Sequence, residues 1–96
     1  MKPKLIIPET SPIPLRINEI IAAVMFALEG EINDIKTQTY LRQIVTTILG
    51  YYSREGTFAV ICDETNNSSE VVRKGELHLT ITMGNLDIPY VLKASN

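Results

Sequence analysis

The chain has 96 residues, of which 45% are apolar and 21% are charged, and its formal net charge at pH 7 is −2. This length fits one domain, and the apolar share is too high for a disordered chain. The nine basic residues are scattered along the chain, which argues against a nucleic-acid partner, and the single cysteine excludes an intrachain disulfide.

From the first residues of the sequence we expect neither a targeting segment nor a membrane anchor. Its apolar run, Leu5–Ile7, is far shorter than the core of a signal peptide. No stretch of the chain approaches the roughly 20 apolar residues that are needed to span a bilayer. The sequence therefore predicts a soluble protein without a membrane partner.

Residues 1–14 are predicted to form an extended N-terminal arm. They hold four of the five prolines, and proline fixes φ and favours an extended residue before it. Lys4–Ile7 is expected to be a short strand whose apolar side chains need a partner. That partner is either the arm's own domain or the sheet edge of a neighbouring subunit. We therefore divide the chain into this arm and a domain over residues 15–96.

The domain is predicted to begin with a helix over residues 15–29. Apolar residues recur there at helical spacing, and Met25 widens the stripe that they form. Gly30 is the expected C-cap. The stripe consists of Ile17, Ile20, Ile21, Val24 and Leu28.

A second, longer helix is predicted over residues 34–53. Asn33 or Asp34 can supply the side-chain oxygen that caps its first backbone N–H groups, and Gly56 is expected to close it. Its apolar side chains again share one face. They are Leu41, Ile44, Val45, Ile48, Leu49 and Tyr52.

The segment after the second helix is predicted to hold a strand and a turn. Thr57–Asp63 is rich in β-forming residues, and both of its faces are apolar, which favours a central position in the sheet. Glu64–Ser69 has the composition of a turn. Ser68 or Ser69 is expected to cap a single helical turn that ends at Gly75.

Two more strands are predicted to complete the chain. Glu76–Met83 alternates apolar and polar side chains, and Ile88–Lys93 follows a turn at residues 84–87. Pro89 cannot donate a hydrogen bond to a ladder, which favours a sheet edge for the last strand. Helices that precede a run of strands predict an α+β domain, with two helices packed on a small antiparallel or mixed sheet.

No group of residues has the spacing of an active site. Cys62 with His78 as its base would be a possible nucleophile, but the acids Asp63 and Glu64 beside the thiol would raise its pKa. A zinc site needs several Cys or His residues, and the acids and amides near the turn lack the spacing of a calcium-binding loop. Nucleotide-binding glycine motifs are absent. We therefore expect no enzyme activity and no catalytic, metal or cofactor site.

The segment Phe58–Leu79 has the sequence FAVICDETNNSSEVVRKGELHL. It combines a strand that ends in a Cys-Asp pair, a polar turn with Thr and Asn, a short turn with Gly, and an alternating strand. This arrangement resembles the C-terminal domain of contractile phage tail sheath proteins, and the two predicted helices extend the resemblance to about residues 15–93. The residues that match the family's turn are Cys62, Asp63, Asn66, Asn67 and Gly75.

The resemblance implies a structural virion protein of a contractile bacteriophage tail, assembled in the host cytoplasm. Copies of the chain would form a ring, hexameric by the family's pattern, and terminal arms would add strands to the sheets of neighbouring subunits. The other implied partners are sheath, tube, baseplate or neck proteins of the same tail. The expected interface residues are Leu5, Ile6, Ile7, Tyr90, Val91 and Leu92.

The chain departs from a full sheath subunit in two ways. Its 96 residues do not include the large domains that precede this one in the family, so we expect a single-domain version, and residues 84–87 replace the family's turn of basic residues and proline. A single-domain version would connect rings without driving contraction. The last residues, GNLDIPYVLK, are also similar to the end of baseplate sheath-initiator proteins. The alternative from another class is a non-enzymatic regulatory module that binds a peptide at an exposed sheet edge.

Overall fold

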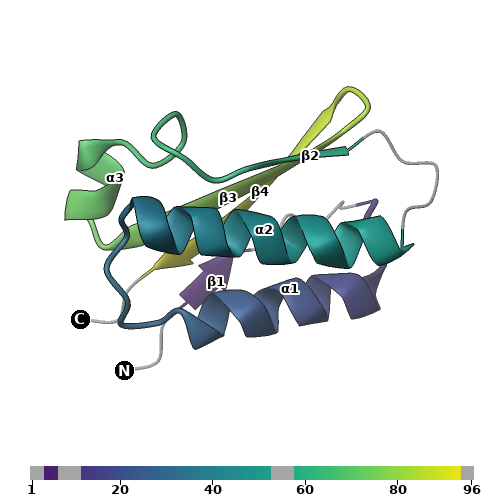
Figure 1. The fold of residues 1–96 in the computed structure, drawn as a ribbon, viewed down its shortest axis with the longest axis horizontal. Coiled ribbons are helices and arrows are strands. Elements are labelled where there is room, and N and C mark those ends of the chain that lie inside the picture. The colour runs from purple at the N-terminus through teal and green to yellow at the C-terminus, as the bar shows by residue number, and fades with distance from the viewer. Residues whose placement is uncertain (1–3, 7–11, 53–57, 94–96) are drawn as a thin grey trace.

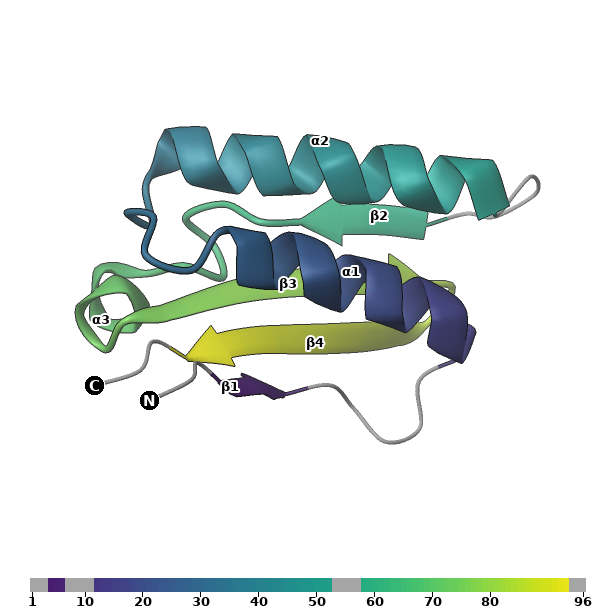
Figure 2. The same cartoon turned by 90° about the horizontal axis from the view of Figure 1, so that it is seen from below.

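Three helices and a four-stranded antiparallel sheet form a two-layer α+β domain, as the sequence predicts. The structure is a computed structural model that describes residues 4–6, 12–52 and 58–93. Helices α1 and α2 lie side by side across one face of the sheet (Figures 1 and 2). The elements in chain order are β1 (Lys4–Ile6), α1 (Leu15–Ala27), α2 (Ile35–Tyr52), β2 (Phe58–Ile61), α3 (Ser69–Arg73), β3 (Glu76–Met83) and β4 (Leu86–Lys93).

The β3–β4 hairpin is the centre of the sheet, whose strand order is β1-β4-β3-β2. Its register runs without a break from Glu76 opposite Lys93 to Met83 opposite Leu86. Strand β4 therefore begins two residues earlier than predicted, because Gly84 and Asn85 alone make the turn. Gly84 has φ +59°, a conformation that glycine adopts without steric cost.

Two predictions about strand neighbours are wrong. Strand β2 lies at an edge of the sheet, and β4 lies inside it, between β3 and β1. Apolar side chains on both sides of β2 indicate that both of its faces are covered. Neighbouring strands pair along the edges of a strand, so the side-chain pattern does not determine where β2 lies in the strand order. In the described part of the chain, strand β1 pairs with β4 at residues 91–93, so Pro89 lies beyond this paired stretch.

The core lies between the helices and the inner face of the sheet. Both predicted helical stripes face it, although Met25, with none of its surface exposed, lies at the centre of its stripe and not at the margin. Tyr52 is 54% exposed, so its predicted place on the buried face is wrong; the last turn of α2 extends past the start of β2 (Figures 1 and 2). The buried members from the helices are Ile17, Ile21, Met25, Leu41, Val45 and Leu49, and those from the sheet include Leu77, Leu79, Ile81, Ile88, Tyr90 and Leu92.

The starts of α2 and α3 follow the predicted chemistry, whereas the C-cap of α1 is Leu28 and not the predicted Gly30. The Asp34 carboxylate accepts a hydrogen bond from the Thr37 backbone N–H (3.0 Å), so Asp34, not Asn33, caps α2. The Ser68 hydroxyl caps α3 by accepting from the Val71 N–H, and Gly75, at φ +73°, follows it. Helix α1 ends two residues earlier than predicted. The predicted roles of Ile7, Thr57 and Gly56 lie outside the described residues.

Part of the predicted arm belongs to the domain. Ile13 is only 4% exposed and packs in the core, and its carbonyl accepts a hydrogen bond from the Asn18 side chain (3.1 Å). Asn18 in turn accepts a hydrogen bond from the Tyr90 hydroxyl. The segment just before α1 is therefore anchored to the core by Ile13.

Candidate functional site

The residues from Cys62 to Asn67, here called the asparagine turn, connect β2 to α3. The Asp63 carboxylate accepts hydrogen bonds from the backbone N–H and the hydroxyl of Thr65. The side-chain oxygen of Asn66 accepts from the Asp63 N–H (3.0 Å), and its side-chain amide donates to the Ile61 backbone carbonyl (2.8 Å). Short polar side chains that bond nearby backbone groups stabilise such a turn, as the sequence predicts.

Asn67 continues the sheet beyond the end of β2. Its side-chain oxygen accepts a hydrogen bond from the His78 N–H, and its amide donates to the His78 carbonyl, both at 2.9 Å. In the β2–β3 register, Ile61 pairs with Thr80, so an uninterrupted strand would place residue 63 opposite His78. The side chain of Asn67 therefore replaces a peptide group of β2 and pairs with β3 in its place.

The asparagine turn is also tied to the helical layer. The Asn33 amide donates to the Asn67 oxygen (3.0 Å) and to the Glu76 carbonyl (2.9 Å), while Gln38 donates to the Asn33 oxygen (2.8 Å). The Arg42 guanidinium donates to the Cys62 carbonyl (3.3 Å). Within the described residues, every buried side-chain nitrogen and oxygen has a hydrogen-bond partner. These amides are therefore satisfied inside the protein.

The ionisable groups near the asparagine turn are buried, as in Cys62, or hydrogen-bonded to each other, as in His78 and Glu76. Burial raises the pKa of the Cys62 thiol from 9.0 to about 11, and the negative charge of Asp63 makes only a minor contribution to this rise. The thiol is therefore protonated at neutral pH, when a nucleophile would need the thiolate. His78 Nε2 lies 2.8 Å from the Glu76 carboxylate, and this hydrogen bond lowers the pKa of Glu76. No group of three Cys, His, Asp or Glu residues in the described ranges could hold a metal ion.

The structure separates the predicted interface residues into two groups. Tyr90 has no exposed surface and Leu92 is 5% exposed, so both lie in the core of their own chain. Leu5 and Val91 are half-buried and Ile6 is 39% exposed, so these three line the β1–β4 edge of the sheet. Ile7 lies outside the described residues. The interface role of all six residues stays a prediction.

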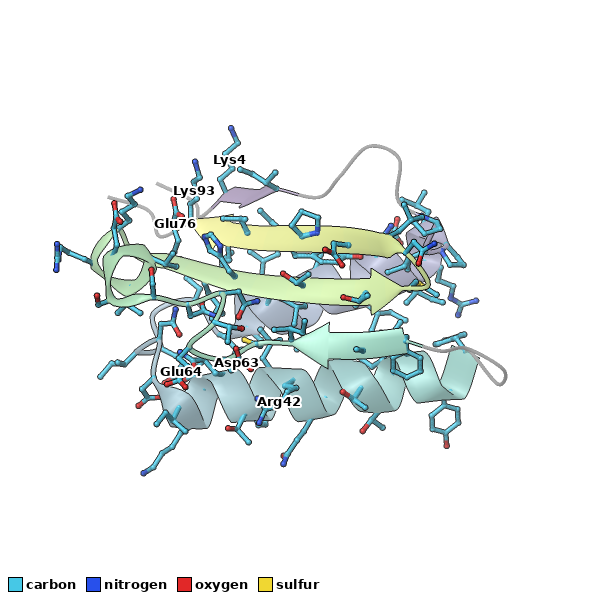
Figure 3. The ribbon with its side chains drawn as sticks, turned by 90° about the horizontal axis from the view of Figure 1, so that it is seen from above. Lys4, Arg42, Asp63, Glu64, Glu76 and Lys93 are labelled. Atoms are coloured by element: carbon cyan, nitrogen blue, oxygen red, sulfur yellow. The ribbon has the colours of Figure 1, made fainter. Side chains whose placement is uncertain are left out.

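The face of the sheet away from the helices is partly exposed and carries charges at one end. In the register of β1, β4 and β3, Lys4 lies opposite Lys93, and Lys93 lies opposite Glu76. Figure 3 shows these three residues at the same end of the sheet, with Arg42, Asp63 and Glu64 beside the asparagine turn. The turn itself therefore presents acidic groups to solvent, while its amides point inward.

Sequence reasoning missed the polar residues that hold the layers together. Asn18 and Gln38 are each 7% exposed, and both sit on the buried face of a helix. A signal was present, since Gln38 is three residues before Leu41 and Asn18 is three before Ile21. A polar residue in phase with an apolar stripe indicates a buried hydrogen bond. The partner of that bond, however, is not visible in the pattern.

Comparison with known proteins gives no family model, no curated protein and no solved structure that matches this chain. None of the helices in the described part of the chain is both long enough and apolar enough to cross a membrane.

Proposed function

We propose that this chain is a structural component of a contractile phage tail, a sheath-like subunit or a sheath-connecting baseplate or neck protein, that assembles into rings by exchange of its N-terminal strand. The observation that carries the proposal is the β1–β4 pairing. Three residues of β1 pair with the edge of β4, which is a site where any extended segment of suitable sequence can bind. The resemblance of residues 58–79 to the C-terminal domain of tail sheath proteins is the reason for proposing rings in a contractile tail.

The energy that holds β1 to its own chain is small. A backbone hydrogen bond contributes about 0.5–1.5 kcal/mol net, whereas ordering one residue costs about 1–2 kcal/mol. Leu5, the residue of β1 that packs against the core, is half-buried. These terms nearly cancel, so a neighbouring copy can supply the same strand in the same register at little cost.

Within the described residues, β1 pairs with only part of the β4 edge. Residues 86–90 of β4 have no partner on this side within the described part of the chain, because β1 covers residues 91–93. A strand from a neighbouring subunit could extend along this stretch. Pro89 interrupts it, since proline lacks the N–H that a full ladder requires.

A cysteine pair across β1 and β4 tests the exchange directly. Ile6 lies opposite Val91, so Ile6→Cys in one copy and Val91→Cys in another can form a disulfide only if the strand crosses between chains. After the two variants are mixed and oxidised, we expect a crosslinked heterodimer on a non-reducing gel. The double variant is expected to give a ladder of crosslinked oligomers.

The matched control is Ile35→Cys mixed with Val91→Cys, because Ile35 is 79% exposed on α2 and lies away from the β1–β4 pairing. Monomers with an internal disulfide as the sole product of the double variant would contradict exchange. Deletion of residues 1–11 is the complementary test; it spares Ile13, which belongs to the core. The shortened chain is expected to stay folded and to lose its oligomers in sedimentation.

The open stretch of β4 also favours the alternative function, a module that captures a peptide. Size-exclusion chromatography with electron microscopy separates the two proposals. Rings or tubes of the full chain support the tail component. A monomer at every concentration, without crosslinks between chains, supports the peptide-binding module.

A further inference from the structure

Two positive charges meet across the pairing of β1 with β4. Lys4 lies opposite Lys93, and Lys93 lies opposite Glu76 on its other side. The apolar neighbours of these residues in each strand face the core, so the three charged side chains share the face away from the helices. We call these three residues the lysine row; Figure 3 shows them at one end of the sheet. Like charges directly opposite each other destabilise a pair of strands.

The one carboxylate of the lysine row is already engaged. Glu76 lies 2.8 Å from His78 Nε2, and this hydrogen bond is the largest of the causes that lower the pKa of Glu76. The charges of Lys93 and Lys74 lower the same pKa further. A single carboxylate therefore serves a histidine and two lysines before Lys4 is counted. Within the described residues, Lys4 and Lys93 form no ion pair.

Lys93 is also the charged residue closest to Lys4 in the sheet. Adjacent strands lie about 4.8 Å apart, so Lys4 is one strand spacing from Lys93 and two from Glu76. The repulsion at Lys4 therefore exceeds the attraction. No other acidic side chain at this end belongs to β1, β3 or β4. In the described part of the chain they are Glu29, Glu31 and Asp34 in the α1–α2 connection, Asp63 and Glu64 in the asparagine turn, and Glu70 in an ion pair with Lys74.

We infer that the repulsion between Lys4 and Lys93 keeps β1 loosely attached, so that ionic strength sets how often β1 leaves the edge of β4. Dissolved salt screens charges at a surface, and both lysines are exposed. Because β1 is three residues long, one unfavourable pair is a large part of its attachment. The same repulsion acts when β1 pairs with another copy, so it favours neither chain. It makes the strand available for exchange.

An internal disulfide measures the attachment of β1. Ile6→Cys and Val91→Cys are combined in one chain with Cys62→Ala, because Ile6 lies opposite Val91. The monomer is equilibrated at low concentration in a buffer of 2-mercaptoethanol and its disulfide, which are uncharged. The oxidised fraction gives the effective concentration of the two thiols. Raising the salt from about 10 mM to about 0.5 M shortens the Debye length from roughly 30 Å to about 4 Å, so this concentration should rise about two- to threefold.

Charge variants identify the cause. Lys4→Gln should raise the effective concentration about two- to fivefold at low salt and remove most of its salt dependence, because the like charge is gone. Glu76→Gln should lower it about twofold, since the row then has no negative charge. Lys36→Gln is the matched control: Lys36 is exposed on α2, away from β1 and β4, and the change should have no effect. Equal values for Lys4→Gln and Lys36→Gln would overturn the inference.

This role of the lysine row rests on the proposed strand exchange, but the two can fail separately. In the mixture of Ile6→Cys and Val91→Cys chains, Lys4→Gln in the first chain should slow the interchain disulfide by the factor that it adds to the internal one. An interchain disulfide whose rate ignores Lys4→Gln would overturn the control by charge and leave exchange standing. Salt and charge effects within single chains, without any interchain disulfide, would support the loose attachment and contradict exchange.

Discussion

The asparagine turn and strand β1 attach segments to opposite sides of the same β3–β4 hairpin. Asn67 is 4% exposed and forms hydrogen bonds with the N–H and the carbonyl of His78 and with Asn33. Strand β1 is attached by three backbone pairs and one half-buried leucine, and its Ile6 is 39% exposed. Both attachments extend the sheet, one through a side chain and one through a separate strand.

The difference lies in what happens when each attachment opens. Loss of the Asn67 side chain leaves the partly buried His78 N–H without its partner, which costs about 1–3 kcal/mol, and leaves the His78 carbonyl with only the longer hydrogen bond from the Asn66 amide (3.4 Å). Release of β1 exposes a sheet edge that water can solvate. The asparagine turn is therefore part of the fold, whereas β1 is an attachment that another chain can provide.

The largest effect is expected from Asn67→Ala. This change removes both hydrogen bonds between Asn67 and His78 and one of the two acceptors of the Asn33 amide, so the free energy of unfolding should fall by about 3 kcal/mol. Urea titration followed by circular dichroism measures the loss. Gln43→Ala, which removes an exposed amide of α2, is the control and should cost less than about 0.5 kcal/mol. A loss below 1 kcal/mol for Asn67→Ala would make the two attachments equivalent.

A smaller loss is expected where the chain is fastened before α1. Tyr90→Phe removes the hydroxyl that donates to the buried Asn18, and we expect a loss of about 1–2 kcal/mol. Tyr40→Phe is the matched control, because Tyr40 is 53% exposed. Thermal unfolding of the two variants should differ by several degrees. Equal melting temperatures would show that the Asn18 contact contributes nothing to the anchoring of this segment.

Strand β1 itself is expected to contribute little to stability. Leu5→Ala removes part of a half-buried side chain, so the free energy of unfolding should fall by about 0.5–1 kcal/mol. The same change, introduced into both partners of the Ile6→Cys and Val91→Cys mixture, should markedly reduce the interchain disulfide. A loss as large as that of Asn67→Ala would instead make β1 a fixed part of the domain.

At neutral pH, titration of Cys62 should have no effect on stability. Because burial raises the pKa of its thiol to about 11, the folded protein keeps the proton while the unfolded chain loses it above about pH 9. The stability of the natural chain, relative to Cys62→Ala, should be constant below about pH 8 and fall between pH 9 and 11. At pH 8, alkylation of the folded thiol should be about 100-fold slower than that of a free cysteine. Rapid alkylation would show that the asparagine turn opens readily.

The sequence predicted local structure well, because the relevant forces act between residues close in the chain. The helical stripes, the Ser68 cap, the glycine after α3 and the bounds of β3 follow from side-chain spacing and backbone preference. The alternation of Glu76–Met83 assigned each side chain to the correct face of the sheet. The turn residues of the candidate site were also identified from sequence, although only as a turn.

Strand order and hydrogen-bond partners could not be predicted in this way. An apolar pattern shows which faces are covered and is silent about edges, so the prediction of a central β2 was wrong. The prediction that β4 lies at an edge rested on Pro89, which lies beyond the residues that pair with β1 in the described part of the chain. The same limit applies to Tyr90 and Leu92, which alternate onto the inner face of β4 and are buried within their own chain. Their alternation with Ile88 indicates a shared face, but the helices that cover this face are distant in the sequence, so the pattern did not show whether the same chain or a neighbour buries it.

The sequence by itself determined the α+β class, the helices, the alternating strands and the chemical character of the asparagine turn, because each of these depends on periodicity or on preferences of a few adjacent residues. Only the tertiary structure decided that Asn67 replaces a peptide group opposite His78, and that Asn33 and Gln38 tie this turn to the helices. It also decided that β1 attaches to the edge of β4. These contacts join residues 5 to 89 positions apart, and a hydrogen bond between such residues is set by the packing of the layers.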